Sequence, residues 1–276
     1  MDHIAIVTDS TADIPEELTE RHNIHVVPNI LVIDGKSMED GKGISRQEFY
    51  SDLPGMKTFP TTATASSGTY QQLYQRLFQE GFSHIISIHA GSLLSGIFNA
   101  ASLAAQAFGE YVRVIDSRYV TLGLGFQALA AAEAALHEPL ESVLALIEDV
   151  RQRVRVVALL DTLEYVRRSG RVSWARAHLG ELLQIKPLIE IRSGQVVRLG
   201  EERTRRKGIE RLLRHLSDLG KLERLAILHT NAEQEALRIL DDLQPDLPVR
   251  PFCVNITPII GAHVGPNGLG FAAVVR

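Results

Sequence analysis

The fold class is decided by residues 84–100, which read HIISIHAGSLLSGIFNA. Residues 84–88 form a short apolar run that predicts a buried strand, and the small residues that follow, to Phe108, predict a helix. A strand that leads into a helix is the repeating unit of an α/β fold, in which ligands bind at the carboxyl ends of the strands. We therefore expect residues 91–96, where strand and helix join, to lie at such an edge.

The join itself has the residue types of a ligand loop. Ser92, Ser95 and Gly96 lie where a helix begins, and free backbone N–H groups at a helix start attract anions. Serine is also a favoured N-cap, so the same residues are compatible with an ordinary capped helix. Both interpretations stay open on this stretch alone.

Outward from the centre, strands and helices alternate over the first half of the chain. Residue 13 is the expected N-cap of a helix in which Pro15 occupies the first turn and Glu16 completes a capping box. Asp34-Gly35 predicts a hairpin turn, and residues 60–64 a hydroxyl-rich loop. The expected strands are 4–7, 24–27, 30–33, 84–88 and 111–115, and the expected helices include 46–53, one through 70–78, 128–136 and 139–153.

The pattern changes near residue 154, after which strands also pair locally. The expected elements are strands 154–160, 185–191, 195–199, 225–229, 249–255 and 269–275, with helices 162–168, 173–183 and 207–219 and another helix after Asn231. We expect a Rossmann-like α/β domain over residues 1–154 and an α/β domain with a mixed sheet over residues 155–276. No low-complexity linker separates them, so we expect them to pack directly together.

Composition excludes several classes of function. The 276 residues carry a net charge of −4, which recruits neither nucleic acid nor an anionic membrane. The single cysteine, Cys253, excludes an internal disulfide and a cysteine-built metal site. The sequence has no apolar run near the ~20 residues of a membrane span and no leader pattern, so we expect a cytoplasmic protein.

Two glycines resemble part of a dinucleotide-binding fingerprint. Gly123 and Gly125 follow a predicted strand, but the third glycine of that pattern is absent. A dinucleotide-dependent enzyme is therefore poorly supported, and we expect these glycines to permit close packing of a helix on a strand.

Hydroxyl groups recur at the ends of the predicted strands. They occur at 8–10, 61–62, 92–95 and 116–117, and His263 lies in a glycine-rich stretch, 258–270, that we expect to be a loop. Hydroxyls and one imidazole suit a single carboxylate, because they bind it without burying a permanent counter-charge. A lone histidine in such a loop is otherwise a structural hydrogen-bonding group, and that alternative stays open.

Taken together, the motifs resemble the DegV family of fatty-acid-binding proteins, which serve as binding subunits of bacterial fatty acid kinase. The resemblance covers essentially the whole chain. It rests on Thr8-Asp9-Ser10, Pro60-Thr61-Thr62, Ser92-x-x-Ser95-Gly96, Val114-Ile-Asp116-Ser117, Leu163-Glu164-Tyr165, Gly170-Arg171-Val-Ser173, Lys186-Pro187, Arg203-Thr204-Arg205 and Gly261-x-His263-x-Gly265-Pro266. It implies two packed α/β domains, an acyl chain buried in a tunnel and a carboxyl group at the domain junction.

The resemblance also implies the site residues. Thr61 or Thr62, together with Ser92 and His263, would contact the carboxyl group, and Ser95 and Gly96 complete the expected ligand-binding set. The family binds a long-chain fatty acid without a cofactor, a metal or catalytic residues of its own. Three departures from the family pattern bear on chain-length and saturation preference: this chain has Ala63-Thr64-Ala65 where the family has Ser-Gln-Pro, Gly91 where it has a serine, and Ile97-Phe98 where it has Thr-Tyr.

The resemblance places ATP chemistry on a partner kinase, and the chain accordingly lacks a Walker motif. We expect Arg203, Arg205 and Arg171 to dock the kinase or meet the acyl phosphate, since arginine suits bidentate phosphate contact. A solvated basic face is the alternative. The role also allows transient membrane contact, since acyl phosphate feeds phospholipid synthesis. A serine hydrolase using Ser92 or Ser95 with His263 is a second class, but neither serine lies in a G-x-S-x-G elbow.

Overall fold

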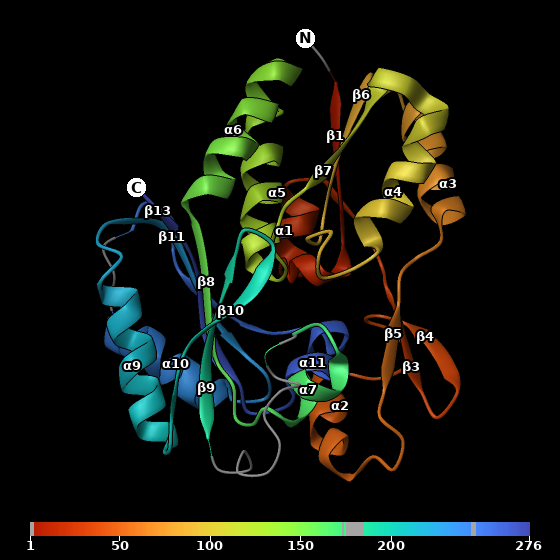
Figure 1. Cartoon of the computed structure of the whole chain (residues 1–276). Helices are drawn as coiled ribbons and strands as arrows, with labels where there is room; N and C mark the ends of the chain where they lie inside the picture. Colours follow the sequence, from red (N-terminus) through yellow and green to blue (C-terminus); the bar gives the residue numbers. More distant parts are fainter. Residues whose placement is uncertain (1–2, 173, 175–184, 244–246) are drawn as a thin grey trace. The chain divides into compact units, whose positions relative to one another are not determined.

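The computed structural model describes residues 3–172, 174, 185–243 and 247–276 (Figure 1). The chain forms two compact units: the first contains the residues to Ile30 and Ala63–Val154, and the second contains Leu31–Thr62 and Arg155–Arg276. The chain passes from the first unit to the second for the last time after residue 154. Residues 31–62 differ from the expectation of a continuous domain 1–154, because they group with the second unit.

The first unit is built on a four-stranded parallel sheet in the order β2-β1-β6-β7. Its strands are β1 (Ile4–Asp9), β2 (Ile24–Val27), β6 (His84–His89) and β7 (Val112–Asp116). Its helices are α1 (Glu16–Arg21), α3 (Ser67–Gln79), α4 (Ile97–Ala105), α5 (Leu122–Ala134) and α6 (Leu140–Arg153), with 3-10 turns at Ser10–Ala12 and Gln106–Tyr111. Because all four strands run in one direction, their carboxyl ends share one edge of the sheet.

Apolar side chains of the sheet are covered by helices within this unit. Ala5 and Val7 of β1 pack in one core with Tyr70 and Tyr74 of α3 and with Ala101 of α4. Figure 1 shows α3 and α4 on one side of these strands and α5 and α6 on the other. The two central strands, β1 and β6, are mostly apolar because both of their faces are buried.

Two local predictions in this unit are wrong. Asp13 does not cap α1; it is a buried residue at a φ of 54° after the 3-10 turn, and Pro15 precedes the helix without a side-chain cap. Helix α5 begins at Leu122 rather than at the predicted residue 128. The predicted helix left out Gly123 and Gly125, but both glycines lie inside this buried helix. A Cβ at Gly125 would lie 2.5 Å from the carbonyl oxygen of Ala12, so this glycine permits close packing of α5 on the 3-10 turn Ser10–Ala12 rather than on a strand.

The second unit contains the expected mixed sheet, in the order β10-β9-β8-β13-β11-β12. Its strands are β8 (Val154–Leu159), β9 (Lys186–Arg192), β10 (Gln195–Glu202), β11 (Leu222–His229), β12 (Phe252–Asn255) and β13 (Leu269–Val275). Strands β11 and β12 pair in parallel, whereas β8–β9, β9–β10 and β11–β13 pair antiparallel. The helices are α7 (Glu164–Ser169), α9 (Arg205–Ser217), α10 (Glu233–Leu243) and α11 (Pro258–Val264). Nearly all of the predicted helix 173–183 lies outside the described residues.

Residues 31–62 add a helix and a small sheet to this unit. They contain α2 (Arg46–Asp52) and a 3-10 turn at Leu53–Gly55, and they contribute to a sheet of order β4-β3-β5. Its strands are β3 (Ile30–Ile33), β4 (Lys36–Glu39) and β5 (Thr61–Ala63). Phe49 and Tyr50 of α2 share a core with Tyr165, Ile259 and Ala262, which explains why the segment belongs to the second unit.

Two predicted loops are regular elements. Residues 61–63 form strand β5, since β-branched threonines suit a pleated surface. Residues 258–264 form helix α11, because the Thr257 hydroxyl accepts from the Ile259 N–H and Pro258 occupies the first turn. The predicted loop position of His263 is therefore corrected to the last turn of a helix.

No helix among the residues described is long and apolar enough to cross a membrane. The part of the chain that the structure covers also contains no group of three or more His, Cys, Asp or Glu side chains placed to hold a metal ion.

Candidate functional site

Thr62 and His263 come together in the second unit from positions 201 residues apart. Thr62 lies on β5 and His263 at the end of α11, and Thr62 Oγ1 lies 3.0 Å from His263 Nε2. Alternate residues of a strand point to opposite faces, so Thr61, which is exposed, faces away from this pair. Of the two threonines expected at the head group, Thr62 is the one that meets the histidine.

Buried contacts of the second unit fix the position of α11. The Tyr50 hydroxyl donates to the Ile256 carbonyl oxygen at 2.9 Å, and the Thr257 hydroxyl donates to Asp40 Oδ2 at 2.5 Å. Gly261 faces the Tyr50 ring, and a Cβ at that position would lie 2.3 Å from Tyr50 Oη. These contacts leave α11 little freedom, so the imidazole of His263 is held in place before any ligand arrives.

His263 is a neutral group at physiological pH. Burial, and secondarily the charge of Arg171, lowers the pKa of His263 to about 4. A neutral imidazole and a hydroxyl both donate and accept hydrogen bonds, and which one donates in this pair depends on the tautomer. The pair can therefore bind a polar head group through hydrogen bonds without a buried cation.

The connection between β6 and α4 does not offer the free backbone N–H groups that we expected. The N–H groups of three consecutive residues are already bonded: Ala90 N to Asp9 Oδ2 at 3.2 Å, Gly91 N to Tyr119 O at 2.8 Å, and Ser92 N to Asp116 Oδ1 at 3.2 Å. The N–H groups of Leu94 and Ser95 both donate to the Gly91 carbonyl oxygen. The free N–H groups expected over residues 91–96 are therefore not found at Gly91, Ser92, Leu94 and Ser95, because nearby loop and strand-end acceptors already bind them.

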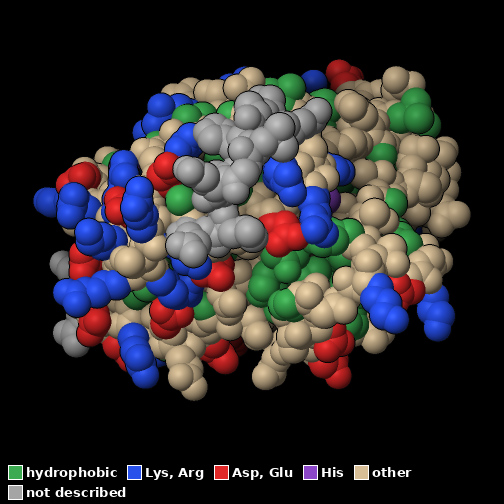
Figure 2. All heavy atoms as spheres, turned by 60° about the horizontal axis from the view of Figure 1, so that its bottom comes forward, with side chains coloured by type: hydrophobic (Ala, Val, Ile, Leu, Met, Phe, Trp, Pro, Cys, Tyr) green, Lys and Arg blue, Asp and Glu red, His purple; other side chains and the backbone are tan. Residues whose placement is uncertain are grey.

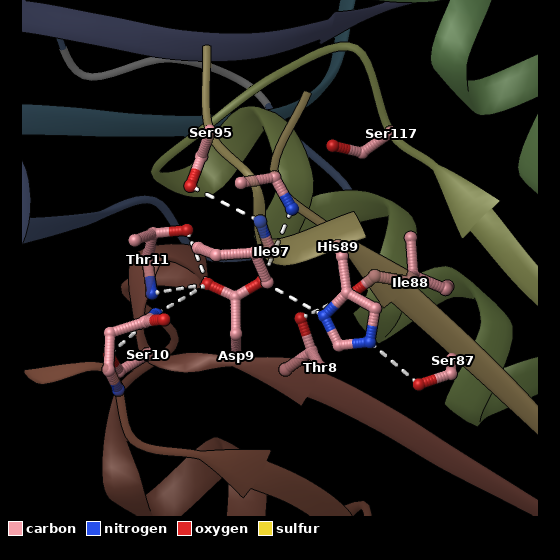
Figure 3. A network of polar contacts seen from close by, with 12 residues as sticks. Thr8, Asp9, Ser10, Thr11, Ser87, Ile88, His89, Ser95, Ile97 and Ser117 are labelled. Atoms are coloured by element: carbon pink, nitrogen blue, oxygen red, sulfur yellow. Dashed lines mark hydrogen bonds and ion pairs between the residues drawn. The ribbon is translucent and has the colours of Figure 1, made fainter. Parts of the chain in front are cut away.

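The predicted serines have distinct local partners. The Ser92 hydroxyl donates to Asp116 Oδ2 at 2.6 Å. Ser95 Oγ accepts from the Ile97 N–H at 3.4 Å, as Figure 3 shows. Gly96 is exposed and is the N-cap residue of α4, without a side-chain cap. Within the described residues, no histidine hydrogen-bonds Ser92 or Ser95, so neither has the base that a hydrolytic serine needs.

Asp9 is the centre of a buried polar network that sequence reasoning did not identify as such (Figure 3). Its Oδ1 accepts from the Thr11 N–H, the Thr11 hydroxyl and the Asn29 amide, and its Oδ2 accepts from His89 Nδ1 at 3.0 Å and from the Ala90 N–H. Burial opposes ionisation of this carboxyl group, but the hydrogen bonds from His89 and Thr11 outweigh it and hold the pKa of Asp9 below its ordinary value. Asp9 thus fixes the start of the β6–α4 connection.

The network continues from His89 into the core of the first unit. His89 Nε2 lies 2.7 Å from Ser87 Oγ, which lies 2.8 Å from Tyr74 Oη. Ser87, His89 and Tyr74 are completely buried. The sequence did carry a signal: Ser87 and His89 are polar side chains at alternate positions of an otherwise apolar strand, and such groups require buried partners.

The three predicted phosphate-contacting arginines differ in their surroundings. Arg205 forms ion pairs with Glu235 at 2.6 Å and Asp161 at 3.6 Å, so its charge is already neutralised locally. Arg171 and Arg203 are exposed, and Arg171 acts electrostatically on His263. Figure 2 shows Lys and Arg side chains mixed with Asp and Glu at the left, the side on which Figure 1 places α9.

Comparison with known proteins assigns the chain to a family. The family model described as "Uncharacterised protein, DegV family" matches residues 3–276. A DegV domain-containing protein of Listeria innocua is 34% identical over 279 residues, covering 99% of both chains.

Solved structures agree with this assignment. The crystal structure of "DegV, a fatty acid binding protein from Bacillus subtilis" is 32% identical and covers 100% of both chains with a TM-score of 0.88. "Fatty Acid Binding of a DegV family Protein from Thermus thermophilus" describes a structure that is 30% identical and covers 99% of this chain and 100% of that one, with a TM-score of 0.89. These matches confirm the α/β fold and the resemblance stated from the motifs. This chain is a member of the DegV family.

Proposed function

We propose that this protein binds a long-chain fatty acid and that Thr62 and His263 bind its carboxyl group. The observation that carries the proposal is the Thr62–His263 pair, an uncharged and pre-positioned set of hydrogen-bonding groups. The fatty-acid binding stated for the Bacillus subtilis and Thermus thermophilus relatives supports the same ligand class.

The energetics of such a complex depend on the head group. Burial of a C16 chain at ~0.8 kcal/mol per methylene supplies about 10 kcal/mol of gross driving force. Burial of an uncompensated carboxylate would cost several kcal/mol. Hydrogen bonds to the head group therefore determine whether binding is tight.

Ser92, Ser95 and Gly96 remain proposed head-group residues of the first unit. Ser92 is half-buried at the carboxyl end of β6, where open α/β sheets bind ligands. Its hydroxyl oxygen retains lone pairs while its hydrogen is donated to Asp116, so it can accept a hydrogen bond from a ligand.

In the wider reaction, we propose that the chain presents the bound carboxyl group to a kinase subunit that phosphorylates it. The chain would then act in the cytoplasm as a carrier rather than as an enzyme, with transient contact to a membrane. Exposed Arg171 and Arg203 suit contact with the kinase or with the acyl phosphate, whereas Arg205 is better explained as a structural ion-pair residue.

The head-group assignment is tested by binding of oleate and of oleyl alcohol, which keeps the chain but carries no charge. We expect His263→Ala and Thr62→Val each to weaken oleate binding roughly ten- to a hundredfold, since a lost partner of a buried polar group costs about 1–3 kcal/mol. Thr61→Val is the matched control, because Thr61 is exposed on the other face of β5, and it should bind like the unaltered protein. Equal weakening of acid and alcohol by His263→Ala would show that the histidine only shapes α11.

The kinase step is tested with a bacterial fatty acid kinase catalytic subunit and oleate-loaded protein. Arg203→Ala and Arg171→Ala should lose acyl-phosphate formation while still binding oleate. Arg76→Ala removes an exposed charge from α3 and should leave the rate unchanged. Equal rates for all three variants would contradict the arginine assignment, and labelling of Ser92 or Ser95 by a fluorophosphonate would instead favour the hydrolase.

A further inference from the structure

The Ser92 hydroxyl group already donates its hydrogen to the Asp116 carboxyl group. Ser92 Oγ lies 2.6 Å from Asp116 Oδ2 and donates to it. A hydroxyl group has one hydrogen and two lone pairs, so Ser92 offers any further partner only lone pairs. A group that contacts Ser92 Oγ in this arrangement must therefore be a hydrogen-bond donor.

Asp116 accepts hydrogen bonds both through its carboxyl group and through its backbone carbonyl oxygen. Its Oδ1 accepts from the Ser92 N–H at 3.2 Å and from the Arg118 N–H at 2.8 Å, and its backbone carbonyl oxygen accepts from Arg151 Nη1 at 2.8 Å. Arg151 lies near Arg118, Tyr119 and the Asp116 carboxyl group and pairs with Glu148, and His89 on β6 is the register partner of Asp116 in the sheet. Both carboxyl oxygens of Asp116 therefore already accept hydrogen bonds from donors of this chain.

We propose that Asp116 controls the protonation state of the ligand, so that a fatty acid bound at Ser92 is held as the neutral carboxylic acid, its O–H donating to Ser92 Oγ. This inference rests on the proposed function. An ionised carboxylate at Ser92 would find no hydrogen there, and it would lie within about 5 Å of the Asp116 carboxylate, given an ordinary O···O separation. Like charges so close disfavour ionisation of one of them.

The step is a proton transfer to the ligand and nothing more. A free fatty acid is ionised at neutral pH, so the complex takes up one proton from solvent, and that proton stays on the ligand oxygen that faces Ser92. Affinity should then fall as pH rises above the pKa of the free acid and level off above the pKa of the bound acid.

Asp116→Asn reverses the direction of the decisive hydrogen bond. The Ser92 and Arg118 N–H groups both require an acceptor at the Oδ1 position, so the amide oxygen must lie there. The amide nitrogen then faces Ser92 Oγ and donates to it, which releases the Ser92 hydrogen toward the ligand. The Asp116→Asn variant should therefore favour the ionised form of the bound fatty acid.

The experiment follows the carboxyl resonance of [1-13C]palmitate bound to the full chain as a function of pH. In the unaltered protein the bound acid should be protonated at neutral pH, and its titration midpoint should lie above that of the free acid. In Asp116→Asn the midpoint should fall by about one pH unit or more. Asp149→Asn removes the same charge from an exposed position on α6 and should not shift the midpoint.

A second ligand provides an independent readout. Hexadecanesulfonate keeps its charge at every pH used, so it should bind the unaltered protein at least about tenfold more weakly than palmitate, one pKa unit being a factor of ten. Asp116→Asn should reduce the ratio of the palmitate affinity to the hexadecanesulfonate affinity. In a protein that also carries Ser92→Ala, Asp116→Asn should no longer change this ratio.

The outcomes separate this inference from the proposed function. A bound carboxyl that is ionised at neutral pH in the unaltered protein, or a midpoint that Asp116→Asn leaves unchanged, overturns the inference while fatty-acid binding stands. Failure of palmitate to bind at all would instead overturn the proposed function.

Discussion

At the residue scale, burial has opposite consequences for His263 and Asp9 because their neighbours differ. His263 shares one hydrogen bond with Thr62 and is influenced by the charge of Arg171, so burial and that charge both favour its neutral form. Asp9 receives five hydrogen bonds, which overcome the cost of burying its charge. His263 is therefore a neutral hydrogen-bonding group, whereas Asp9 is a charged structural anchor.

The depressed pKa of His263 predicts a pH-dependent loss of stability. Between its ordinary value near 6.5 and its folded value of about 4, the unfolded chain binds a proton that the folded chain does not. Stability therefore decreases as pH falls through this window, by about 2–3 kcal/mol at the acid end. Urea unfolding near pH 7 and pH 4.5 should show a smaller decrease for His263→Gln than for the unaltered protein, and an identical decrease would contradict the assignment.

Asp9→Asn should destabilise the protein by about 3 kcal/mol near neutral pH. An amide retains one acceptor oxygen and places N–H groups against donors that the carboxylate satisfied, and buried donors left unpaired are costly. Because the folded pKa of Asp9 is depressed, its contribution is present above the unfolded pKa and is lost as pH falls through the folded value. The same urea experiments check this, with Asp149→Asn, expected within about 0.5 kcal/mol of the unaltered protein, as control.

At the scale of secondary-structure elements, the candidate head-group pair depends on two short elements, β5 and α11. Neither has the length to be stable alone, and each is held by tertiary contacts. The close approach of α11 to α2 at Gly261 is one such contact, since it allows the Tyr50 hydroxyl to reach the chain just before α11. Displacement of α11 would move His263 relative to Thr62.

Gly261→Ala tests this packing. A Cβ would lie 2.3 Å from Tyr50 Oη and 2.6 Å from its ring carbons, so we expect a loss of about 1–3 kcal/mol in unfolding free energy and weaker oleate binding. Gly68→Ala on α3 is the matched control, because its Cβ would meet no atom closer than 3.6 Å. That variant should be neutral or slightly more stable, since alanine favours a helix. Equal effects of the two substitutions on oleate binding would contradict the proposed role of α11.

At the scale of the whole molecule, the second unit is assembled from two separate parts of the chain. Residues 31–62 bring Leu31, Phe49 and Tyr50 into a core with Tyr165 and Ile259, which come much later in the sequence. Thr62, which pairs with His263, therefore lies on a segment that interrupts the chain of the first unit.

A fragment of residues 1–154 should show this dependence directly. Its residues 31–62 would lack the apolar partners that Tyr165, Ile259 and Ala262 provide, so we expect rapid amide hydrogen exchange and proteolytic cleavage in that segment. Strands β1, β6 and β7 lie wholly inside the first unit and should stay protected. Equal protection of residues 31–62 in the fragment and in the full chain would contradict the assignment of the segment to the second unit.

The sequence by itself determined the α/β class, most strands, the mixed second sheet and the family. Strands 24–27 and 30–33, the Asp34-Gly35 turn and helix 139–153 follow from apolar periodicity and turn chemistry, which are local properties. The DegV family was identified because many short motifs occur in one order, and that order is visible without coordinates.

Only the tertiary structure decided which residues meet. Local sequence assigned 60–64 and 258–270 to loops, because β5 and α11 depend on distant residues, as α11 does on Tyr50. Local sequence could not show that the Asp9 and Asp116 carboxylates accept hydrogen bonds from the N–H groups of residues 90 and 92, because Asp9 and Asp116 lie on neighbouring strands. Hydrogen-bond partners across a sheet depend on strand order, which is set by the packing of the whole unit rather than by any single stretch of chain.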